Sequence, residues 1–352
     1  MSDLGASDDA RWDAFVGGLP LATYLQLSAW ARVKAANGWR AQRVIGGLSA
    51  AASDGDGPTR GALPALVGAQ VLLRRPRGVP WAFGYAPRGP LAARLDGASL
   101  AVWTDALRRE RWLDRVSHVR IDPEIESGGP LDADGGFRQA LRATGWSAAP
   151  EIQPHVTRIV DLRPDEAALW SDLRAKWRQY VRQAERAGVR VVDGDASRLD
   201  EFHAVMGETA RRAGTRIRAR SAYADVWHAF APAGGARLLF ADAPDGSARA
   251  VLFLLRVGDR VVEPYGGMTA AGGADRANYL VKWEAIRSSR AAGATSYDMW
   301  GLVHPGIRQF KAGFGGREIE LIGAFDLPLH RFGWASYRLA ERVRDRRSSR
   351  SG

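Results

Sequence analysis

The sequence predicts a mixed α/β protein built from two similar lobes. The chain has 352 residues, of which 46% are hydrophobic and 13 are tryptophan, so there is enough apolar material for two compact cores. Helical and strand patterns alternate, yet strands outnumber those of a purely alternating doubly wound fold. The segment 237–268 is typical of three consecutive antiparallel strands.

The elements of the first half follow from apolar spacing and from the residues that end each segment. A capped helix is predicted at 7–20. A second follows at 23–39, where Leu25, Trp30 and Val33 form an apolar stripe and Gly38 ends the helix. The remaining predictions are strands at 41–47 and 68–76 around a long polar hairpin loop at 49–64, an aromatic turn segment at 81–90, a helix at 99–112, a strand at 116–125 and a helix at 137–146.

The second half repeats this alternation. We expect a strand at 155–162, one long helix at 166–188, a strand at 189–193, helices at 199–214 and 223–230, strands at 236–243, 248–259 and 260–270, a helix at 277–293, strands at 295–302 and 318–329, and a basic terminal helix from Trp334 with a frayed tail. Residues 176–193 and 282–298 share an order of Lys-Trp, amphipathic helix, Ala-Gly and strand, which favours repeated units.

Composition restricts the function. The net charge of +11 favours a polyanionic partner, such as nucleic acid, a phosphorylated precursor or an anionic membrane face. The absence of cysteine excludes disulfides, thiolate zinc sites and cysteine nucleophiles, and it fits a cytoplasmic protein. The polar N-terminus is unlike a secretory signal, and no apolar run is long enough to span a membrane.

Common catalytic motifs are missing from the sequence. There is no phosphate-binding loop ending in Gly-Lys-Ser/Thr, no His-Glu-x-x-His and no Gly-x-Ser-x-Gly. The six histidines are scattered. Hydrolase, NTPase and zinc-enzyme functions are therefore disfavoured, and we expect neither a cofactor nor a metal.

The segment GIRQFKAGFGG, residues 306–316, carries the strongest functional signal. Lys311 lies between Phe310 and a run of glycines, and Phe314 follows. Aromatic side chains exclude water, which strengthens the field of an ammonium, and glycines allow close approach of the backbone to a substrate. The alternative is a solvated turn lysine beside core aromatics.

Eight segments together resemble the Fem family, the FemABX-type aminoacyl-tRNA-dependent peptidyltransferases of peptidoglycan cross-bridge synthesis. The similarity runs from Ser28 to Leu329. The segments are SAWARVKAANGW, YAPRGP, QPHVTRIVDL, KWRQYVRQAERAGV, ETARRAGTRIR, YLVKWEAIRSSRAAGATSYDMWGL, GIRQFKAGFGG and ELIGAFDLPL, in that order.

The resemblance implies two lobes of the acyl-CoA N-acyltransferase (GNAT) type. The C-terminal segment would fold back on the first lobe. We expect a precursor-binding lobe from residues 1–150 and 317–352, and an aminoacyl-tRNA lobe from residues 151–316. The helical arm of some relatives is not expected, since the sequence holds no long heptad stretch.

The resemblance also implies roles for individual residues. Phe310 and Lys311 would form the transfer site, with Lys311 facing the developing oxyanion or the terminal phosphate of the tRNA. Lys34 and Arg212 would bind precursor phosphates, with Arg216 an alternative register for Arg212. Arg88 would reach a phosphate or the muramyl peptide. Beside the resemblance, we predict that Tyr85 and Tyr265 are pocket aromatics, with buried core tyrosines as the alternative, and that Asp298 orients an amine, accepts a proton or caps a turn.

The implied reaction moves an amino acid from aminoacyl-tRNA to the stem-peptide amine of lipid II or UDP-MurNAc-pentapeptide. We expect a monomer or homodimer in the cytoplasm, peripheral at the anionic inner membrane surface through its basic tail. Three alternatives remain open: an acyl-CoA-dependent N-acyltransferase, an aminoacyl-tRNA-dependent enzyme with a small-molecule acceptor, and a non-catalytic tRNA-binding protein.

Overall fold

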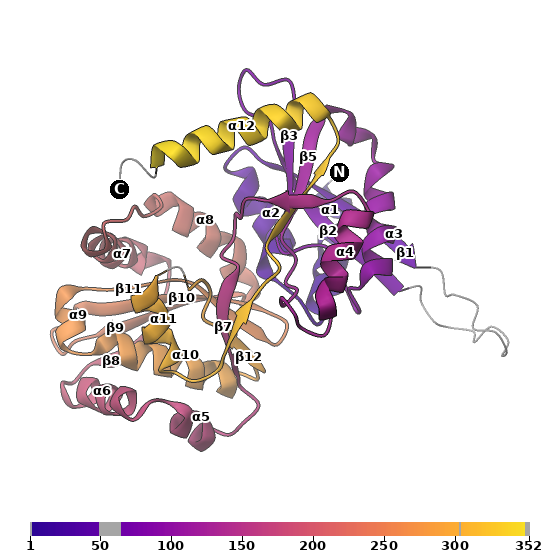
Figure 1. Ribbon diagram of the computed structural model, residues 1–352. Coiled ribbons are helices and arrows are strands. Elements are labelled where there is room, and N and C mark those ends of the chain that lie inside the picture. Colours follow the sequence, from indigo (N-terminus) through magenta and orange to yellow (C-terminus); the bar gives the residue numbers. More distant parts are fainter. Residues whose placement is uncertain (1, 49–64, 303, 349–352) are drawn as a thin grey trace, which may run out of the picture. The chain divides into compact units, whose positions relative to one another are not determined.

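The computed structural model describes residues 2–48, 65–302 and 304–348. The chain divides into two compact units (Figure 1). Unit 1 consists of residues 1–153 and 321–352, and unit 2 consists of residues 154–320. The predicted hairpin loop at 49–64 and the last residues of the basic tail, 349–352, lie outside the described residues.

Unit 1 contains a seven-stranded mixed sheet in the order β1-β2-β3-β5-β14-β6, with β4 paired to β2. The pair β3–β5 is parallel, and β14 is antiparallel to both β5 and β6. The prediction that the C-terminal segment folds back on the first lobe is therefore confirmed. The strands are β1 (Arg40–Leu48), β2 (Ala65–Arg74), β3 (Ala82–Ala86), β4 (Leu91–Ala92), β5 (Val116–Ile121), β6 (Ser147–Ala149) and β14 (Ala324–Pro328).

Strand alternation gives β5 and β14 of the unit 1 sheet one apolar and one charged face. Val119 and Ile121 of β5, with Phe325 and Leu327 of β14, join the apolar core. That core includes residues of α3 (Gly97–Arg108) and α4 (Gly136–Ala143). The other helices are α1 (Ser2–Gly17), α2 (Ser28–Ala35) and α12 (Arg331–Ser348), with single turns at Tyr24–Gln26, Arg111–Arg115 and Ala133–Gly135.

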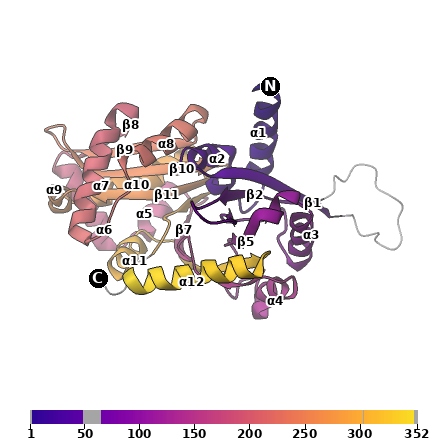
Figure 2. The ribbon, with the colours of Figure 1, turned by 90° about the horizontal axis from the view of Figure 1, so that it is seen from above.

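The opposite face of the same two strands is charged, and it holds α12. Arg120 of β5 donates to Asp326 of β14 at 2.7 and 3.1 Å and to Glu341 of α12 at 2.9 and 3.0 Å. Trp334 donates its indole N–H to Asp326 at 3.0 Å. Figure 2 shows α12, in yellow, running past β5. Tyr337 of α12 also stacks on Phe83, with ring centroids 5.1 Å apart, so buried ion pairs and an aromatic contact together fix the terminal helix.

Unit 2 contains a second seven-stranded mixed sheet in the order β13-β7-β12-β11-β10-β9-β8. Strands β9, β10 and β11 form the predicted antiparallel meander, and β11–β12 is the parallel pair. The strands are β7 (Val156–Asp161), β8 (Arg190–Gly194), β9 (Ala236–Asp242), β10 (Ala248–Val257), β11 (Arg260–Met268), β12 (Ser296–Asp298) and β13 (Arg317–Glu320).

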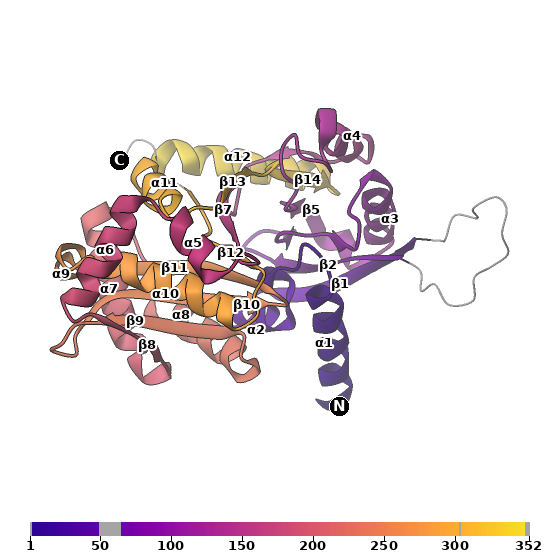
Figure 3. The same cartoon turned by 90° about the horizontal axis from the view of Figure 1, so that it is seen from below.

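Helices cover both faces of the unit 2 sheet. In Figure 1, α7 (Leu199–Ala213) and α8 (Arg220–Phe230) lie above the strands of unit 2 and α6 (Ala175–Arg186) and α10 (Ala277–Ala291) lie below them, and Figure 3 shows α6 and α10 from below. Short helices α5 (Glu166–Asp172), α9 (Ala270–Ala274) and α11 (Pro305–Ala312), and a turn at Ala196–Arg198, complete the unit together with a turn at Ala231–Ala233. None of the helices among the described residues is long and apolar enough to cross a membrane.

Two sequence predictions were wrong in this region. The single helix at 166–188 is broken into α5 and α6, because Leu173 is extended (φ −64°, ψ 139°) and buried in the core. The strand at 318–329 is two strands in different sheets: β13 pairs with β7 of unit 2, and β14 pairs with β5 of unit 1. Residues 317–320 therefore belong to unit 2, although we predicted them in the first lobe.

Candidate active site

A β-bulge in β11 shapes the candidate site. Phe253 of β10 pairs with Tyr265, and Leu255 pairs with Val262, so Glu263 and Pro264 together face the single residue Leu254. The extra residue turns Glu263 and Tyr265 to opposite faces of the sheet. Beside the bulge lies a cavity of about 600 Å³, within unit 2, lined by residues of β11, α10 and α11 and by Trp300 and Gly301.

A buried ion pair forms one wall of this cavity. Lys282 of α10 donates to both carboxylate oxygens of Glu263, and the Tyr297 hydroxyl donates to Glu263 Oε2 at 2.5 Å. Burial and the neighbouring Glu263 carboxylate hold the pKa of Tyr297 well above its ordinary value, so this hydroxyl remains a donor. The carboxylate is therefore satisfied from two elements, α10 and β12.

Lys311 lines the same cavity from the last turn of α11. Its ammonium donates to the carbonyl oxygens of Met299, Trp300 and Gly301 at 2.6, 2.7 and 3.0 Å. An ammonium has three N–H donors, so these carbonyls use all of them. Trp300 adopts a left-handed conformation (φ 56°), which is costly for a non-glycine residue. Lys311 therefore fixes a strained turn at the edge of the cavity.

The environment of Lys311 lowers its pKa to about 8. Burial is the main cause, and the positive charge of Lys282 adds to it, whereas Glu263 and Asp298 oppose the shift. A cation at this position is thus still mostly charged at pH 7 and loses its charge just above the physiological range. Such a pKa is a common property of functional lysines.

Aromatic rings enclose the cavity on the side of α11. Phe310 lines it and makes edge contacts with Tyr279 and Phe314, each with ring centroids 5.2 Å apart. Phe314 is buried in the core of unit 2. Phe310 therefore lines the cavity together with Lys311, whereas Phe314 packs behind it in the core.

The glycines after Lys311 have a different role from the one we predicted. A Cβ on Gly313 would lie 2.4 Å from the Trp177 indole, and one on Gly316 would lie 2.5 Å from the carbonyl oxygen of Ile159. Gly315 and Gly316 also have φ values of 79° and 71°. These residues let the backbone approach other parts of unit 2 closely, so protein packing alone explains them.

Asp298 acts as a turn cap in the structure. It is buried at the end of β12 and accepts hydrogen bonds from the Thr157 hydroxyl, the Arg260 guanidinium and, at 2.7 Å, the Trp300 backbone N–H. Among the three roles that the sequence left open, this geometry corresponds to the cap. Asp298 supports the turn that Lys311 also holds.

Tyr265, Arg212 and Arg216 are not among the residues that line the cavity. The bulge turns the Tyr265 ring toward the rings of Tyr223 and Phe253, whose centroids lie 5.1 and 5.9 Å from its own. Tyr265 therefore does not line the cavity, which differs from our prediction. Arg212 is exposed at the end of α7 and donates to the carbonyl of Met268, a cavity residue. Arg216 is exposed in the segment after α7.

The other predicted residues belong to unit 1. Lys34, in the last turn of α2, places its ammonium 4.7 Å from the Trp30 ring and 5.9 Å from the Trp39 ring. The side chain is partly exposed. Two aromatic rings thus lie beside the ammonium of Lys34.

Tyr85 and Arg88 are buried, which differs from the predicted substrate contacts. The Tyr85 hydroxyl donates to Asp122 at 2.7 Å, and the Arg88 backbone N–H donates to the other oxygen of Asp122 at 2.7 Å. The Arg88 guanidinium lies 3.6 Å from Glu124. Burial raises the pKa of Asp122. The tyrosine therefore corresponds to the alternative of a buried core residue.

Sequence reasoning missed four residues of these networks: Glu263, Lys282, Tyr297 and Asp122. One signal was available for Lys282. The chain has only four lysines, Lys34, Lys176, Lys282 and Lys311, among 50 basic residues. In such an arginine-rich chain, a lysine on the apolar side of a helix is informative, because lysine loses its charge on burial more readily than arginine.

Comparisons with known proteins agree with this arrangement. Residues 171–312 match a family model described as an acetyltransferase (GNAT) domain. A crystal structure of FemX superimposes with a TM-score of 0.79 and 21% identity, covering 92% of this chain and 96% of that one.

Two curated relatives carry the same name, lipid II:glycine glycyltransferase. The protein of Staphylococcus saprophyticus is 27% identical over 247 residues, which are 68% of this chain and 55% of that protein. The protein of Staphylococcus aureus is 27% identical over 234 residues, which are 64% of this chain and 52% of that protein. The chain thus spans about half the length of these relatives.

The fold likeness and the domain match define the class of protein: two units of the GNAT type with mixed sheets, as the resemblance implied. In sequence the chain is similar to these two glycyltransferases, and in fold it is similar to FemX.

Proposed function

We propose that this chain is an aminoacyltransferase that moves an amino acid from aminoacyl-tRNA to the stem-peptide amine of a peptidoglycan precursor. The relatives named lipid II:glycine glycyltransferase support glycine as the amino acid and lipid II as the acceptor. The observation that carries the proposal is the unit 2 cavity, in which Lys311 and Phe310 meet the buried Glu263–Lys282 pair.

The proposed chemistry is aminolysis of an ester. The acceptor amine attacks the aminoacyl carbonyl, a C–N bond forms, and the C–O bond to the tRNA ribose breaks. The proton lost by the amine passes to the departing ribose oxygen, which leaves as a hydroxyl. Since the ester is already activated, catalysis needs orientation of the two substrates and a positive potential where the oxyanion develops.

The cavity offers that potential from two cations. Lys311 and Lys282 both line it, and only Glu263 among the lining residues is acidic. The three N–H groups of Lys311 donate to carbonyls, so its ammonium acts on an oxyanion through its field, or directly after exchanging one carbonyl. Phe310 and Tyr279 keep water from screening this field.

In this proposal the two units bind different substrates. Unit 1 takes the precursor, with Lys34 on its phosphates, and unit 2 takes the charged end of the tRNA. Arg212 and Arg216, which we predicted as precursor contacts, belong to unit 2, so we assign them to the phosphate backbone of the tRNA instead. The net charge of +11 suits two polyanionic substrates.

Transfer of radiolabelled glycine from glycyl-tRNA to purified lipid II tests the proposal. We expect a labelled lipid product that depends on charged tRNA, and parallel reactions with UDP-MurNAc-pentapeptide and with other aminoacyl-tRNAs define the acceptor and the amino acid. Binding of tRNA without transfer to either acceptor would contradict the proposal and favour a non-catalytic tRNA-binding protein.

The GNAT domain match favours one second candidate, an acyl-CoA-dependent N-acyltransferase. In that function a glycine-rich loop opening a helix would bind the pyrophosphate of the cofactor. Here α9 precedes α10, and Gly272 packs against the backbone of Arg249, where a Cβ would lie 2.0 Å from the carbonyl oxygen. Release of free CoA from acetyl-CoA in the presence of an amine acceptor is the deciding measurement.

A further inference from the structure

The terminal helix α12 exposes three large apolar side chains and buries a charged one. Phe332, Leu339 and Val343 are 77%, 63% and 43% exposed. They are spaced by seven and four residues, so they share one face of the helix. The other face carries Glu341, which is buried against Arg120.

Packing within unit 1 explains why the charge of Glu341 is buried, but it gives no reason for the exposed apolar side chains. The ion pair of Arg120 with Glu341 and the stacking of Tyr337 on Phe83 hold the helix to the sheet, and neither contact uses the three exposed apolar residues. An exposed stripe of phenylalanine, leucine and valine costs solubility and adds nothing to the fold. Such a stripe is typical of a surface that another apolar phase covers.

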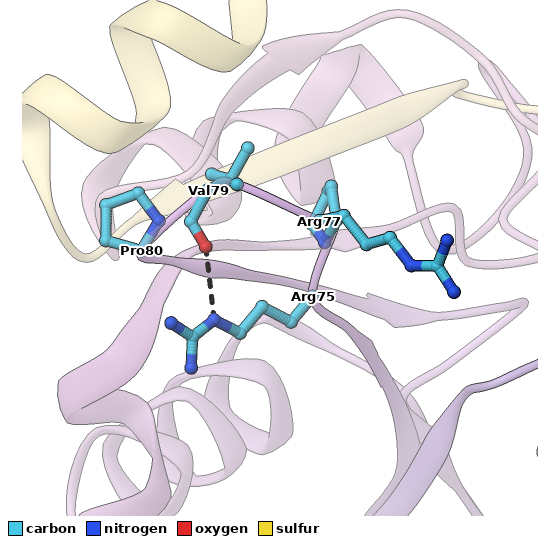
Figure 4. A pocket seen from close by; sticks show the side chains of 6 residues that line it. Arg75, Arg77, Val79 and Pro80 are labelled. Atoms are coloured by element: carbon cyan, nitrogen blue, oxygen red, sulfur yellow. Dashed lines mark hydrogen bonds between the residues drawn. The ribbon is translucent and has the colours of Figure 1, made fainter.

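A basic loop lies next to the start of this helix. The rings of Trp81 and His330 are 4.5 Å apart, and a Cβ on Gly333 would lie 2.9 Å from Trp81. The loop before Trp81 carries exposed Arg75, Arg77 and Val79. Figure 4 shows this loop, with Arg75 donating to the Val79 carbonyl at 3.1 Å and Arg77 pointing away from it.

Further exposed arginines lie on the helix itself. Arg331 begins α12 and Arg342 lies near its end, both exposed. The one acid of α12 with a described side chain, Glu341, is turned inward and paired. The stripe is therefore bordered by positive charge at both ends.

We propose that this surface, the stripe of Phe332, Leu339 and Val343 together with the loop 75–80, docks onto an anionic phospholipid bilayer. Apolar side chains bordered by arginines match the boundary between acyl chains and negative headgroups. A second copy of the chain fits less well, since a twofold contact through this face would oppose arginines with arginines. The inference rests on the proposed function only in that a lipid-linked acceptor would bring the enzyme to a membrane.

Vesicle sedimentation tests the proposal without any substrate. We expect the purified chain to bind vesicles of phosphatidylglycerol mixed with phosphatidylcholine and to bind pure phosphatidylcholine vesicles weakly. The double variant Phe332→Ser/Leu339→Ser should bind the anionic vesicles about tenfold more weakly, and Arg75→Gln/Arg77→Gln should lose about tenfold together with most of the salt dependence.

A matched control separates this surface from general stickiness. Ile45, on the edge strand β1 of unit 1, is 52% exposed, and Ile45→Ser should leave vesicle binding unchanged. Equal binding by Phe332→Ser/Leu339→Ser and the unaltered chain would overturn the proposal, as would an absence of vesicle binding. A concentration-dependent dimer that Leu339→Ser abolishes, measured by sedimentation velocity, would assign the stripe to self-association instead.

Transfer assays distinguish this inference from the proposed function. The stripe variants should keep their rate with a soluble, nucleotide-linked acceptor and lose rate only with acceptor embedded in vesicles. A chain that binds anionic vesicles but transfers to neither acceptor would refute the proposed function and leave the docking surface intact.

Discussion

In both units, an aspartate at the end of a parallel strand accepts a hydrogen bond from the backbone N–H of a residue in the left-handed conformation. In unit 1, Asp122 follows the parallel strand β5 and accepts from the backbone N–H of Arg88, which has φ 55°. In unit 2, Asp298 ends the parallel strand β12 and accepts from the backbone N–H of Trp300, which has φ 56°. Both hydrogen bonds are 2.7 Å long.

The side chains around this hydrogen bond differ. Arg88 turns into unit 1, and its guanidinium lies beside Glu124. In unit 2 the left-handed residue is held by the ammonium of Lys311, beside a cavity of about 600 Å³. The comparison shows that equivalent strand ends in two similar units can differ: the end of β5 is packed in the interior of unit 1, and the end of β12 borders the cavity of unit 2.

The largest effect is expected from breaking the buried pair that only the unit 2 cavity contains. Glu263→Ala leaves Lys282 buried without its carboxylate, which should lower the free energy of unfolding by about 3–5 kcal/mol. Urea unfolding followed by tryptophan fluorescence measures this. The double variant Glu263→Leu/Lys282→Met removes both charges and should recover most of the loss. If the single variant were as stable as the unaltered chain, Glu263→Ala would not leave Lys282 as an uncompensated buried charge.

Replacing Lys311 should lower the rate of transfer without lowering the affinity for tRNA. Lys311→Met removes the positive field at the cavity, and we expect kcat to fall about 10²- to 10³-fold while the affinity for tRNA changes little. Single-turnover transfer and tRNA binding measure the two. Lys176→Met, an exposed lysine of α6, is the matched control. Equal losses in rate and affinity would make Lys311 a binding contact only.

The charge on Lys311 should be lost at moderate pH. Its pKa is lowered from 10.5 to about 8, so the cation is present at pH 7 and falls to about one tenth of the population at pH 9. The unfolded chain keeps its proton up to the ordinary pKa, so stability rises as the pH passes from about 8 to 10.5. Carbon NMR of lysine Cε resolves four lysines, and one titration near 8 should vanish in Lys311→Met. Four ordinary titrations would refute the shift.

The smallest effect is expected in unit 1, at the predicted precursor contact. Lys34→Ala should raise KM for the precursor about fivefold, with kcat nearly unchanged, because it removes a phosphate ligand and leaves the unit 2 cavity intact. Steady-state kinetics with varied precursor measures this, and far-ultraviolet circular dichroism checks the fold. An unchanged KM would place α2 away from the phosphates.

Local patterns predicted the strand meander and the two lobes, because neighbouring residues carry the apolar periodicity and the end signals, whereas the return of the C-terminal strand was implied only by the family resemblance. They also placed Lys311 beside Phe310. They did not reveal that Tyr265 faces away from the cavity, because one bulge opposite Leu254 reverses the alternation. Nor did they reveal the partners of Gly313 and Gly316, which are distant in sequence.

The position of β14 has a consequence for synthesis of the chain. This strand lies between β5 and β6 in the unit 1 sheet, yet more than 170 residues separate it from either. Until residues 326 and 341 leave the ribosome, Arg120 has no carboxylate to neutralise it in a finished sheet. Unit 2 is continuous in sequence and can fold first. The sheet of unit 1 stays incomplete, with one edge of β5 unpaired, until the last residues are translated.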